Sequence, residues 1–159
     1  RENVALGDIS KLHDDAKIKA ALDDAGIGEL PKTNDRGLDL NLGKIYSDGI
    51  DVSGGQWQRI AMARSYISDA RFVIMDEPTA ALDPIAESKM YERFADVLSK
   101  RGAIMISHRL ASAKMADKIF VLSGGTVAEE GTHEELLKKC GLYHEMWEKQ
   151  SSWYTAKEA

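Results

Sequence analysis

The order of apolar and polar residues along the chain predicts helices that alternate with short strands. Apolar residues recur at helical spacing in four segments, 14–25, 56–67, 85–100 and 142–150. Each segment therefore predicts an amphipathic helix with one face in a core. A continuous apolar run at 72–75 is short and is typical of a strand that is buried on both faces. A second apolar run at 103–106 predicts another strand. The pattern as a whole predicts an α/β fold with parallel core strands.

A hairpin and two helices are predicted at the end of the chain. Two adjacent glycines stand between the short apolar runs 119–122 and 127–129, which predicts a tight turn between antiparallel strands. Thr132 and Glu135 have the spacing of a capping box, which marks the start of a helix. Gly141 separates this helix from the last one.

Composition and charge narrow the classes of function. The chain has 159 residues, with 21 Lys or Arg, 26 Asp or Glu and a net charge of −5. Since it contains no basic block, we expect no nucleic acid partner. The single cysteine, Cys140, allows no disulfide within the chain. We expect it to pack, half-buried, as a small apolar residue. No apolar run has the roughly 18 to 20 residues of a membrane helix. We expect a soluble segment of a longer protein, because the chain begins at Arg1 rather than methionine.

Adjacent glycines before a predicted helix indicate an anion site. Ser53, Gly54 and Gly55 stand directly before the helix 56–67. Glycines let the backbone approach a ligand closely, and a serine hydroxyl donates a hydrogen bond. The N-terminus of the helix adds N–H groups and the positive end of the helix dipole. A phosphate group fits such a turn.

Two carboxylates follow the first predicted strand. Asp76 and Glu77 come directly after the run 72–75, and Pro78 prevents simple continuation of the strand. Ligands bind at the carboxyl ends of strands in open α/β sheets. One such carboxylate holds Mg²⁺, while its neighbour orients or deprotonates an attacking water. His108 follows the second apolar run and reaches the same edge if the strands are parallel.

The glycine turn, the acidic strand end and the histidine, in this order, resemble the ATP-binding-cassette (ABC) ATPases. The matching motifs are the signature sequence Ser53-Gly54-Gly55-Gln56, the Walker B strand at 72–77, the D-loop at 81–83 and the switch histidine His108. A chance Ser-Gly-Gly-Gln is expected in only about one chain in several hundred of this length. Val52 and Trp57 depart mildly from the family's pattern, and Trp57 is expected to face outward.

The resemblance implies a partial P-loop NTPase fold. Residues 1–68 would form the α-helical signature subdomain, and residues 69–159 the second part of the ATPase α/β core with its C-terminal hairpin and helices. The Walker A pattern Gly-x-x-x-x-Gly-Lys-Ser/Thr is not matched, because Gly37 lies one position too far upstream of Gly43 and Ile45 replaces the hydroxyl residue. We therefore expect the C-terminal part of a nucleotide-binding domain, which alone does not hydrolyse ATP.

The resemblance also implies a role for each matching residue. Glu77 would be the catalytic base, Asp76 would support Mg²⁺ and His108 would contact the γ-phosphate of ATP. The signature residues 53–56 would close over ATP bound to a second nucleotide-binding domain. Asp83 would lie at the interface between the two domains.

The implied function is ATP hydrolysis that powers export through an ABC transporter. ATP and Mg²⁺ would be the cofactors, and the partners would be a transmembrane domain and a second nucleotide-binding domain, in a homo- or heterodimer. The chain would lie at the cytoplasmic side of the cell membrane. A soluble ABC ATPase of DNA repair or chromosome maintenance is one alternative, although the chain shows neither sustained heptads nor Cys-x-x-Cys. A non-enzymatic binding module is the other, although Glu77 and His108 argue for a working ATPase.

The remaining histidines and tryptophans are expected to have structural roles. His13, His133 and His144 lack the company of other site residues and are predicted to be solvated or capping. Trp147 and Trp153 could stack on a base. The helical spacing of Tyr143, Met146 and Trp147 favours packing instead.

Overall fold

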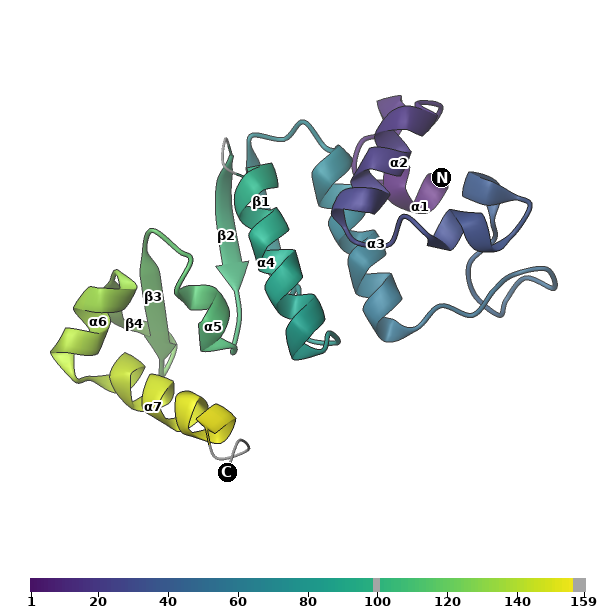
Figure 1. Cartoon of the computed structure of the whole chain (residues 1–159). Coiled ribbons are helices and arrows are strands. Elements are labelled where there is room, and N and C mark those ends of the chain that lie inside the picture. Colours follow the sequence, from purple (N-terminus) through teal and green to yellow (C-terminus); the bar gives the residue numbers. More distant parts are fainter. Residues whose placement is uncertain (99–100, 156–159) are drawn as a thin grey trace. The chain divides into compact units, whose positions relative to one another are not determined.

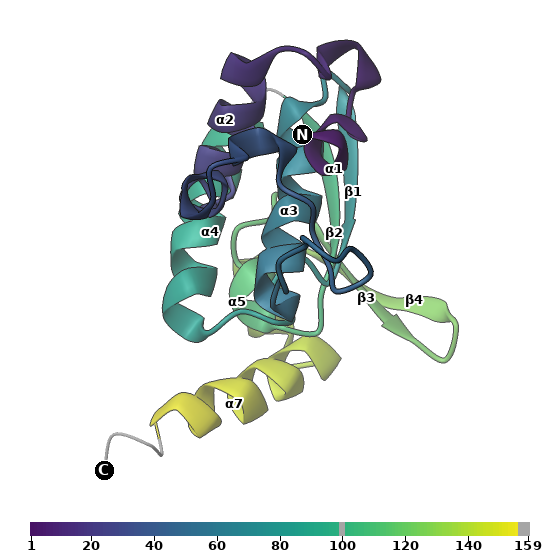
Figure 2. The ribbon, with the colours of Figure 1, turned by 90° about the vertical axis from the view of Figure 1, so that its right-hand side faces the viewer.

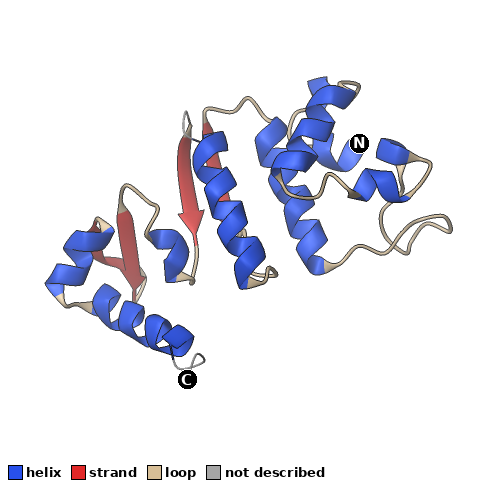
Figure 3. Cartoon of the chain, in the orientation of Figure 1, coloured by secondary structure: helices blue, strands red, loops and turns tan. Residues whose placement is uncertain are grey.

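The computed structural model describes residues 1–98 and 101–155, and the chain divides into two compact units, Arg1–Ile106 and Ser107–Ala159. Figure 1 follows the elements along the chain, and Figure 3 marks helices and strands. The first unit contains α1 (Glu2–Ala5), α2 (Asp15–Asp24), α3 (Gly54–Ile67), β1 (Phe72–Asp76), α4 (Pro84–Leu98) and β2 (Gly102–Ile106), with 3-10 turns η1 (Ile9–Lys11), η2 (Leu30–Thr33) and η3 (Gly37–Asp39). The second contains α5 (Leu110–Ala113), β3 (Ile119–Ser123), β4 (Thr126–Gly131), α6 (His133–Lys139) and α7 (Leu142–Thr155).

The two core strands form a parallel pair, as the apolar runs predict. In β1 and β2, Phe72 pairs with Gly102 and Asp76 pairs with Ile106. The carboxyl ends of both strands therefore lie at the same edge of the sheet. The fold class predicted from the sequence is confirmed.

The prediction that β1 is buried on both faces is wrong. Val73 and Met75 are buried, whereas Phe72 is 52% exposed and Ile74 is 66% exposed. The buried pair belongs to the same apolar cluster as residues of α2, α3 and α4, and Figure 2 shows α3 and α4 on the same side of the strand pair. Helices of this unit thus cover only one face of the strands.

One apolar cluster joins the helices of the first unit and β1. It joins Ile18 of α2, Ile60 and Ala63 of α3, and Met90 and Phe94 of α4. The cluster therefore includes residues on both sides of the subdomain boundary predicted after residue 68. That boundary stays a prediction.

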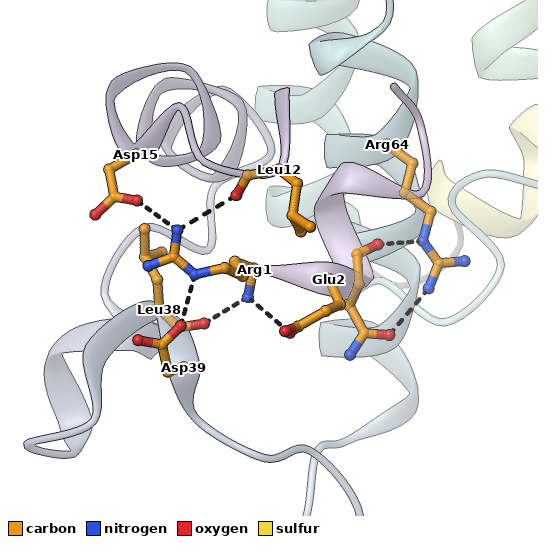
Figure 4. A network of polar contacts seen from close by, with 8 residues as sticks. Arg1, Glu2, Leu12, Asp15, Leu38, Asp39 and Arg64 are labelled. Atoms are coloured by element: carbon orange, nitrogen blue, oxygen red, sulfur yellow. Dashed lines mark hydrogen bonds and ion pairs between the residues drawn. The ribbon is translucent and has the colours of Figure 1, made fainter. Parts of the chain in front are cut away.

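Two arginines fix α1 to its neighbours (Figure 4). Arg64 Nε donates to the carbonyl oxygen of Asn3 at 2.6 Å, which ties α1 to α3. Arg1 donates to the carboxylates of Asp15 and Asp39, each at 2.6 Å. The hydrogen bond from Arg1 holds the pKa of Asp39 below its ordinary value. The start of α2 and the turn η3 are therefore joined through one guanidinium.

Gly7 lets the chain after α1 pass against the backbone of α3. A Cβ atom at this position would lie 1.9 Å from the carbonyl oxygen of Arg64. No side chain fits at that distance, so this contact requires glycine.

Lys11 closes the C-terminal end of α3. Its buried Nζ donates to the carbonyl oxygen of Ile67 at 2.9 Å and forms ion pairs with Asp69 at 2.5 Å and Asp8 at 3.1 Å. A cation at this end of a helix opposes the negative end of the dipole. The hydrogen bond with Asp69 raises the pKa of Lys11, and the same bond lowers the pKa of Asp69. Hydrogen bonds from Ser10 and then Lys11 lower the pKa of Asp8.

We expect the stability contributed by Lys11 to be lost in acid and in strong base. Because the pKa of Asp69 lies below its ordinary value of 3.8 in the folded chain, its contribution is complete above that pH and disappears as the pH falls through the folded value. Because the pKa of Lys11 is raised above 10.5, its contribution is complete below 10.5 and disappears as the pH rises through the folded value.

Lys11→Met keeps the alkyl stem and removes the charge. It should lower the Tm at pH 7, and the difference from the unchanged chain should shrink as the pH falls below 3.8 and the carboxylates become protonated. Thermal unfolding followed by circular dichroism measures this, with the more exposed Lys17→Met as the matched control. An equal loss of Tm at pH 7 and in acid would contradict the charge-based account.

The second unit contains the predicted hairpin and capping box. Strands β3 and β4 are antiparallel, with Ser123 opposite Thr126. The Thr132 hydroxyl accepts from the backbone N–H of Glu135 at 3.3 Å, and the Glu135 carboxylate accepts from the N–H of Thr132 at 2.9 Å. Both sequence-based predictions are confirmed.

The prediction that His133 is solvated or capping is wrong. His133 is only 7% exposed, its Nδ1 lies 2.8 Å from the Tyr143 hydroxyl, and its ring packs edge-on against Trp147 with centroids 4.5 Å apart. The first turn of α6 faces the apolar stripe of α7, and this contact buries the imidazole. His13 is exposed, as expected.

Cys140 is exposed rather than half-buried. It has a left-handed φ of 52° at the C-terminal end of α6, where the chain turns away from the core. Trp147 packs against the cluster of the second unit, as predicted. The side chain of Trp153, the predicted helix end at Lys100 and residues 156–159 lie outside what the structure describes. In the described part of the chain, no helix combines the length and apolar character needed to cross a bilayer.

Candidate functional site

The glycine turn of the sequence forms the start of α3. Ser53 is the N-cap, and its hydroxyl oxygen accepts from the N–H of Gln56 at 3.2 Å. The side-chain oxygen of Gln56 accepts in return from the N–H of Ser53 at 2.9 Å. This reciprocal capping fixes the turn, and it makes the helix begin at Gly54, two residues earlier than predicted.

The turn offers hydrogen-bond donors for an anion. The N–H groups of Gly54 and Gly55 lie in the first turn of α3, where an amide has no partner within the helix. No hydrogen bond to them occurs within the described residues. The Ser53 hydroxyl accepts with a lone pair in the cap, so its proton stays available for donation. The positive end of the helix dipole reinforces these donors.

The turn lies against the D-loop motif of the same unit. A Cβ atom on Gly55 would lie 3.1 Å from the carbonyl oxygen of Ala81, whereas one on Gly54 would meet only the Cβ of Ala81, at 3.9 Å. A cavity of about 660 Å³ is lined by residues of both motifs. They are Ser53, Gly55, Gln56, Ala81, Leu82 and Asp83. Arg59 and Glu29 also line the cavity and bring opposite charges to it.

Asp76 and Glu77 lie at the carboxyl end of β1. The N–H of Glu77 donates to the carbonyl oxygen of Ile106 at 2.9 Å, so pairing with β2 extends one residue past the strand. Asp76 is exposed and Glu77 is half-buried. Glu77 has a left-handed φ of 48°, which costs a residue with a side chain about 1 to 2 kcal/mol. Strained backbone of this kind is concentrated at functional sites.

Gln58 holds the loop that follows Glu77. Its Nε2 donates to the carbonyl oxygen of Glu77 at 3.2 Å, and its Oε1 accepts from the N–H of Ala81 at 2.9 Å. Sequence reasoning missed this residue. Its position three residues after Gly55, on the same face of α3, was the available signal.

A buried polar network anchors the other side of the same loop. The hydroxyl of Thr79, which is 1% exposed, donates to the carboxylate of Glu87 at 2.9 Å. The Tyr91 hydroxyl donates to the same carboxylate oxygen at 3.0 Å and lies 2.9 Å from the Thr79 hydroxyl. The network fixes the loop to α4, and sequence reasoning missed it as well.

Asp83 caps α4. Its Oδ1 accepts from the N–H groups of Ala86 at 2.9 Å and Ile85 at 3.0 Å. The hydrogen bond from Ala86, with a smaller contribution from Ile85, lowers the pKa of Asp83. The carboxylate therefore stays ionised at neutral pH and faces the cavity that contains the turn 53–56.

His108 belongs to the second unit and follows β2 by two residues. Its side chain is exposed. The structure thus brings the signature turn and Asp83 to one cavity, which neither Asp76 nor Glu77 lines. Gln58 of α3 contacts the backbone of Glu77, and His108 belongs to the other unit.

A metal ion and a phosphate group place different demands on the described residues. Among the described residues, no three His, Cys, Asp or Glu side chains gather as a group that could hold a metal ion. The exposed carboxylate of Asp76 fits Mg²⁺ all the same, because that ion is usually held by one or two carboxylates together with waters and phosphates. The paired donors of the turn 53–56 fit a phosphate group.

Comparisons with known proteins connect this geometry to a family. The family model described as ABC transporter matches residues 1–80. The chain is 43% identical over 151 residues to the subtilin transport ATP-binding protein SpaT of Bacillus subtilis, covering 95% of the chain and 25% of that protein. It is 42% identical over 147 residues to the nisin transport ATP-binding protein NisT of Lactococcus lactis subsp. lactis, covering 92% of the chain and 24% of that protein.

A solved structure is also similar. A bacterial Atm1-family ABC exporter with ATP bound matches with a TM-score of 0.81 and 36% sequence identity, over 93% of this chain and 25% of the exporter chain. The chain thus spans about a quarter of the length of the relatives that it matches.

Proposed function

This chain belongs to the ABC transporter family, and on that premise we propose that it is the C-terminal part of the nucleotide-binding domain of an export-type transporter. In the full-length protein, ATP hydrolysis would power transport across a membrane. One observation carries the proposal: the glycine turn at the start of α3 lies against the loop that follows Glu77, around a common cavity. A phosphate-binding turn and a water-activating carboxylate are thereby linked within one unit.

Glu77 is the catalytic base in this proposal. Its carboxylate takes a proton from the attacking water, and its backbone is held by Ile106 on one side and Gln58 on the other. Asp76 would hold Mg²⁺, which supplies positive charge to the triphosphate of ATP when both are bound. His108 would donate a hydrogen bond to the transferred phosphoryl group.

The signature turn serves a second nucleotide-binding domain. Ser53 and Gln56 fix the turn, and the amides of Gly54 and Gly55 donate to phosphate oxygens of ATP bound by that other domain. The Asp83 carboxylate lies on the rim of the same cavity and would face the interface. The remaining partner is the transmembrane domain, so the chain would lie at the cytoplasmic side of the membrane.

This chain by itself should not hydrolyse ATP. None of its segments matches the Walker A lysine and amide cradle that hold the β- and γ-phosphates. The isolated 159 residues should therefore show no ATP turnover above buffer.

Two neighbouring glycines test the function of the turn. In the full-length transporter, Gly55→Ala should lower kcat for ATP by about tenfold, because its Cβ would press on the Ala81 carbonyl oxygen at 3.1 Å. Gly54→Ala adds a methyl group that meets only ordinary contact with the Cβ of Ala81 at 3.9 Å, so a loss of kcat in this variant would come from the ligand that the turn approaches rather than from packing against Ala81. Phosphate release from membrane-reconstituted protein measures both rates. Full activity of Gly55→Ala, or turnover by the isolated chain, would contradict the proposal.

A further inference from the structure

Helix α7 has a glutamine on its packed face. Tyr143, Trp147 and Gln150 follow one another at spacings of four and three residues, so they lie on one side of the helix. Tyr143 is buried and Trp147 packs against the same apolar cluster. Gln150 is half-buried at the next position of this stripe. A side-chain amide placed there requires polar partners, because burying it unpaired is costly.

Gln150 finds its partners in the loop that carries His108. Its Nε2 donates to the carbonyl oxygen of His108 at 2.6 Å. Its Oε1 accepts from the N–H of Leu110 at 2.9 Å. Leu110 is the first residue of α5, and Arg109 before it supplies no side-chain cap. The glutamine therefore caps this helix from a distant part of the sequence.

Two serines fix the backbone between these bonds. The Ser107 hydroxyl oxygen accepts from the N–H of Arg109 at 3.0 Å. The buried Ser112 hydroxyl donates to the carbonyl oxygen of Arg109 at 2.6 Å. Side chains thus hold polar backbone groups of three successive residues, and Gln150 joins this loop to α7 through two of these bonds.

We propose that Gln150 is a positioning residue that fixes the backbone of His108 and so holds its imidazole in the position required for hydrolysis. The inference rests on the proposed function, in which His108 contacts the γ-phosphate. Gln150 does not itself touch the nucleotide. Because a displacement of about 1 Å in a catalytic arrangement costs up to about a hundredfold in rate, releasing both bonds should slow the chemical step and leave ATP binding unchanged.

The test uses the full-length transporter with Mg²⁺ and ATP. Gln150→Met keeps the length of the side chain and removes both hydrogen bonds. It should lower kcat about tenfold with KM for ATP within about twofold of the unchanged protein. Gln150→Glu keeps an acceptor for Leu110 but has no donor for His108, so it should lose about as much. Lys149→Met, one residue away on the exposed side of α7, is the matched control and should retain kcat.

A double variant separates positioning from general destabilisation. In a His108→Ala background, Gln150→Met should cause no further loss of kcat, because the group that it positions is gone. An equal loss in both backgrounds, or a loss that follows a lower Tm, would mean that Gln150 only stabilises the unit. If Gln150→Met is fully active while His108→Ala is slow, the role of Gln150 is overturned and the role of His108 stands. Full activity of His108→Ala would overturn the role of His108 in the proposed function, and that of Gln150 with it.

Discussion

Glu77→Gln in the full-length transporter is expected to lower steady-state ATP hydrolysis by at least about a hundredfold while ATP still binds. Glutamine has the size of glutamate but cannot take a proton from water at neutral pH. The hydrogen bonds that fix this residue, to Ile106 and from Gln58, use its backbone, so the substitution leaves them intact. The loss should therefore appear in kcat rather than in the affinity for ATP.

Phosphate release gives the rate, and equilibrium binding of labelled ATP gives the affinity. Glu92→Gln is the matched control, because it makes the same chemical change on the exposed side of α4. It should hydrolyse ATP at the unchanged rate. An unchanged rate in Glu77→Gln would remove this residue from the role of base.

Gly7→Ala is expected to destabilise the first unit by about 3 kcal/mol. The new Cβ would lie 1.9 Å from the carbonyl oxygen of Arg64, and a backbone atom has no rotamer by which to move away. The contact between the chain after α1 and α3 must therefore open. Chemical denaturation of the chain, followed by far-ultraviolet circular dichroism, measures the change in the free energy of unfolding.

Gly37→Ala is the matched control, because it tests the cost of a left-handed backbone conformation without any overlap of atoms. Gly37 has a left-handed φ of 57°, and nothing lies within 4 Å of a Cβ there. Alanine at this position should cost only about 1 kcal/mol, for the backbone alone. Equal losses for the two variants would show that close approach to Arg64 does not explain Gly7.

The sequence predicts most elements because their signals are local. The apolar periodicity gives α2, α3 and α4, and the predicted capping box at Thr132 is confirmed as a hydrogen-bonded pair. The capping box at Ser53 was found only in the structure. Burial of a strand depends on elements that are distant in the sequence. An apolar run such as Phe72 to Met75 does not show which faces of a strand are covered, and here helices of the unit cover one face only.

The parts of the site that the sequence missed depend on contacts between distant residues. Gln58 and Gln150 look like ordinary polar positions on helices until the fold brings loops against them. Glu87 likewise looks like a solvated acid, although Thr79 and Tyr91 bury it. Motif spacing identifies the reactive groups, but it gives no information on the side chains that hold their backbones. The roles assigned to Asp76, Glu77, His108, Asp83 and the turn 53–56 stay predictions.

The two hydrogen bonds made by Gln58 would couple the sites of two associated nucleotide-binding domains. One amide side chain ties α3, whose first turn would clasp a neighbour's nucleotide, to the loop that carries Glu77. On the proposed function, a shift of α3 when that neighbour binds or leaves would pass through this side chain to the Glu77 carbonyl and the Ala81 amide. Each of two such domains would then respond, through the position of this glutamine, to the nucleotide that the other domain binds.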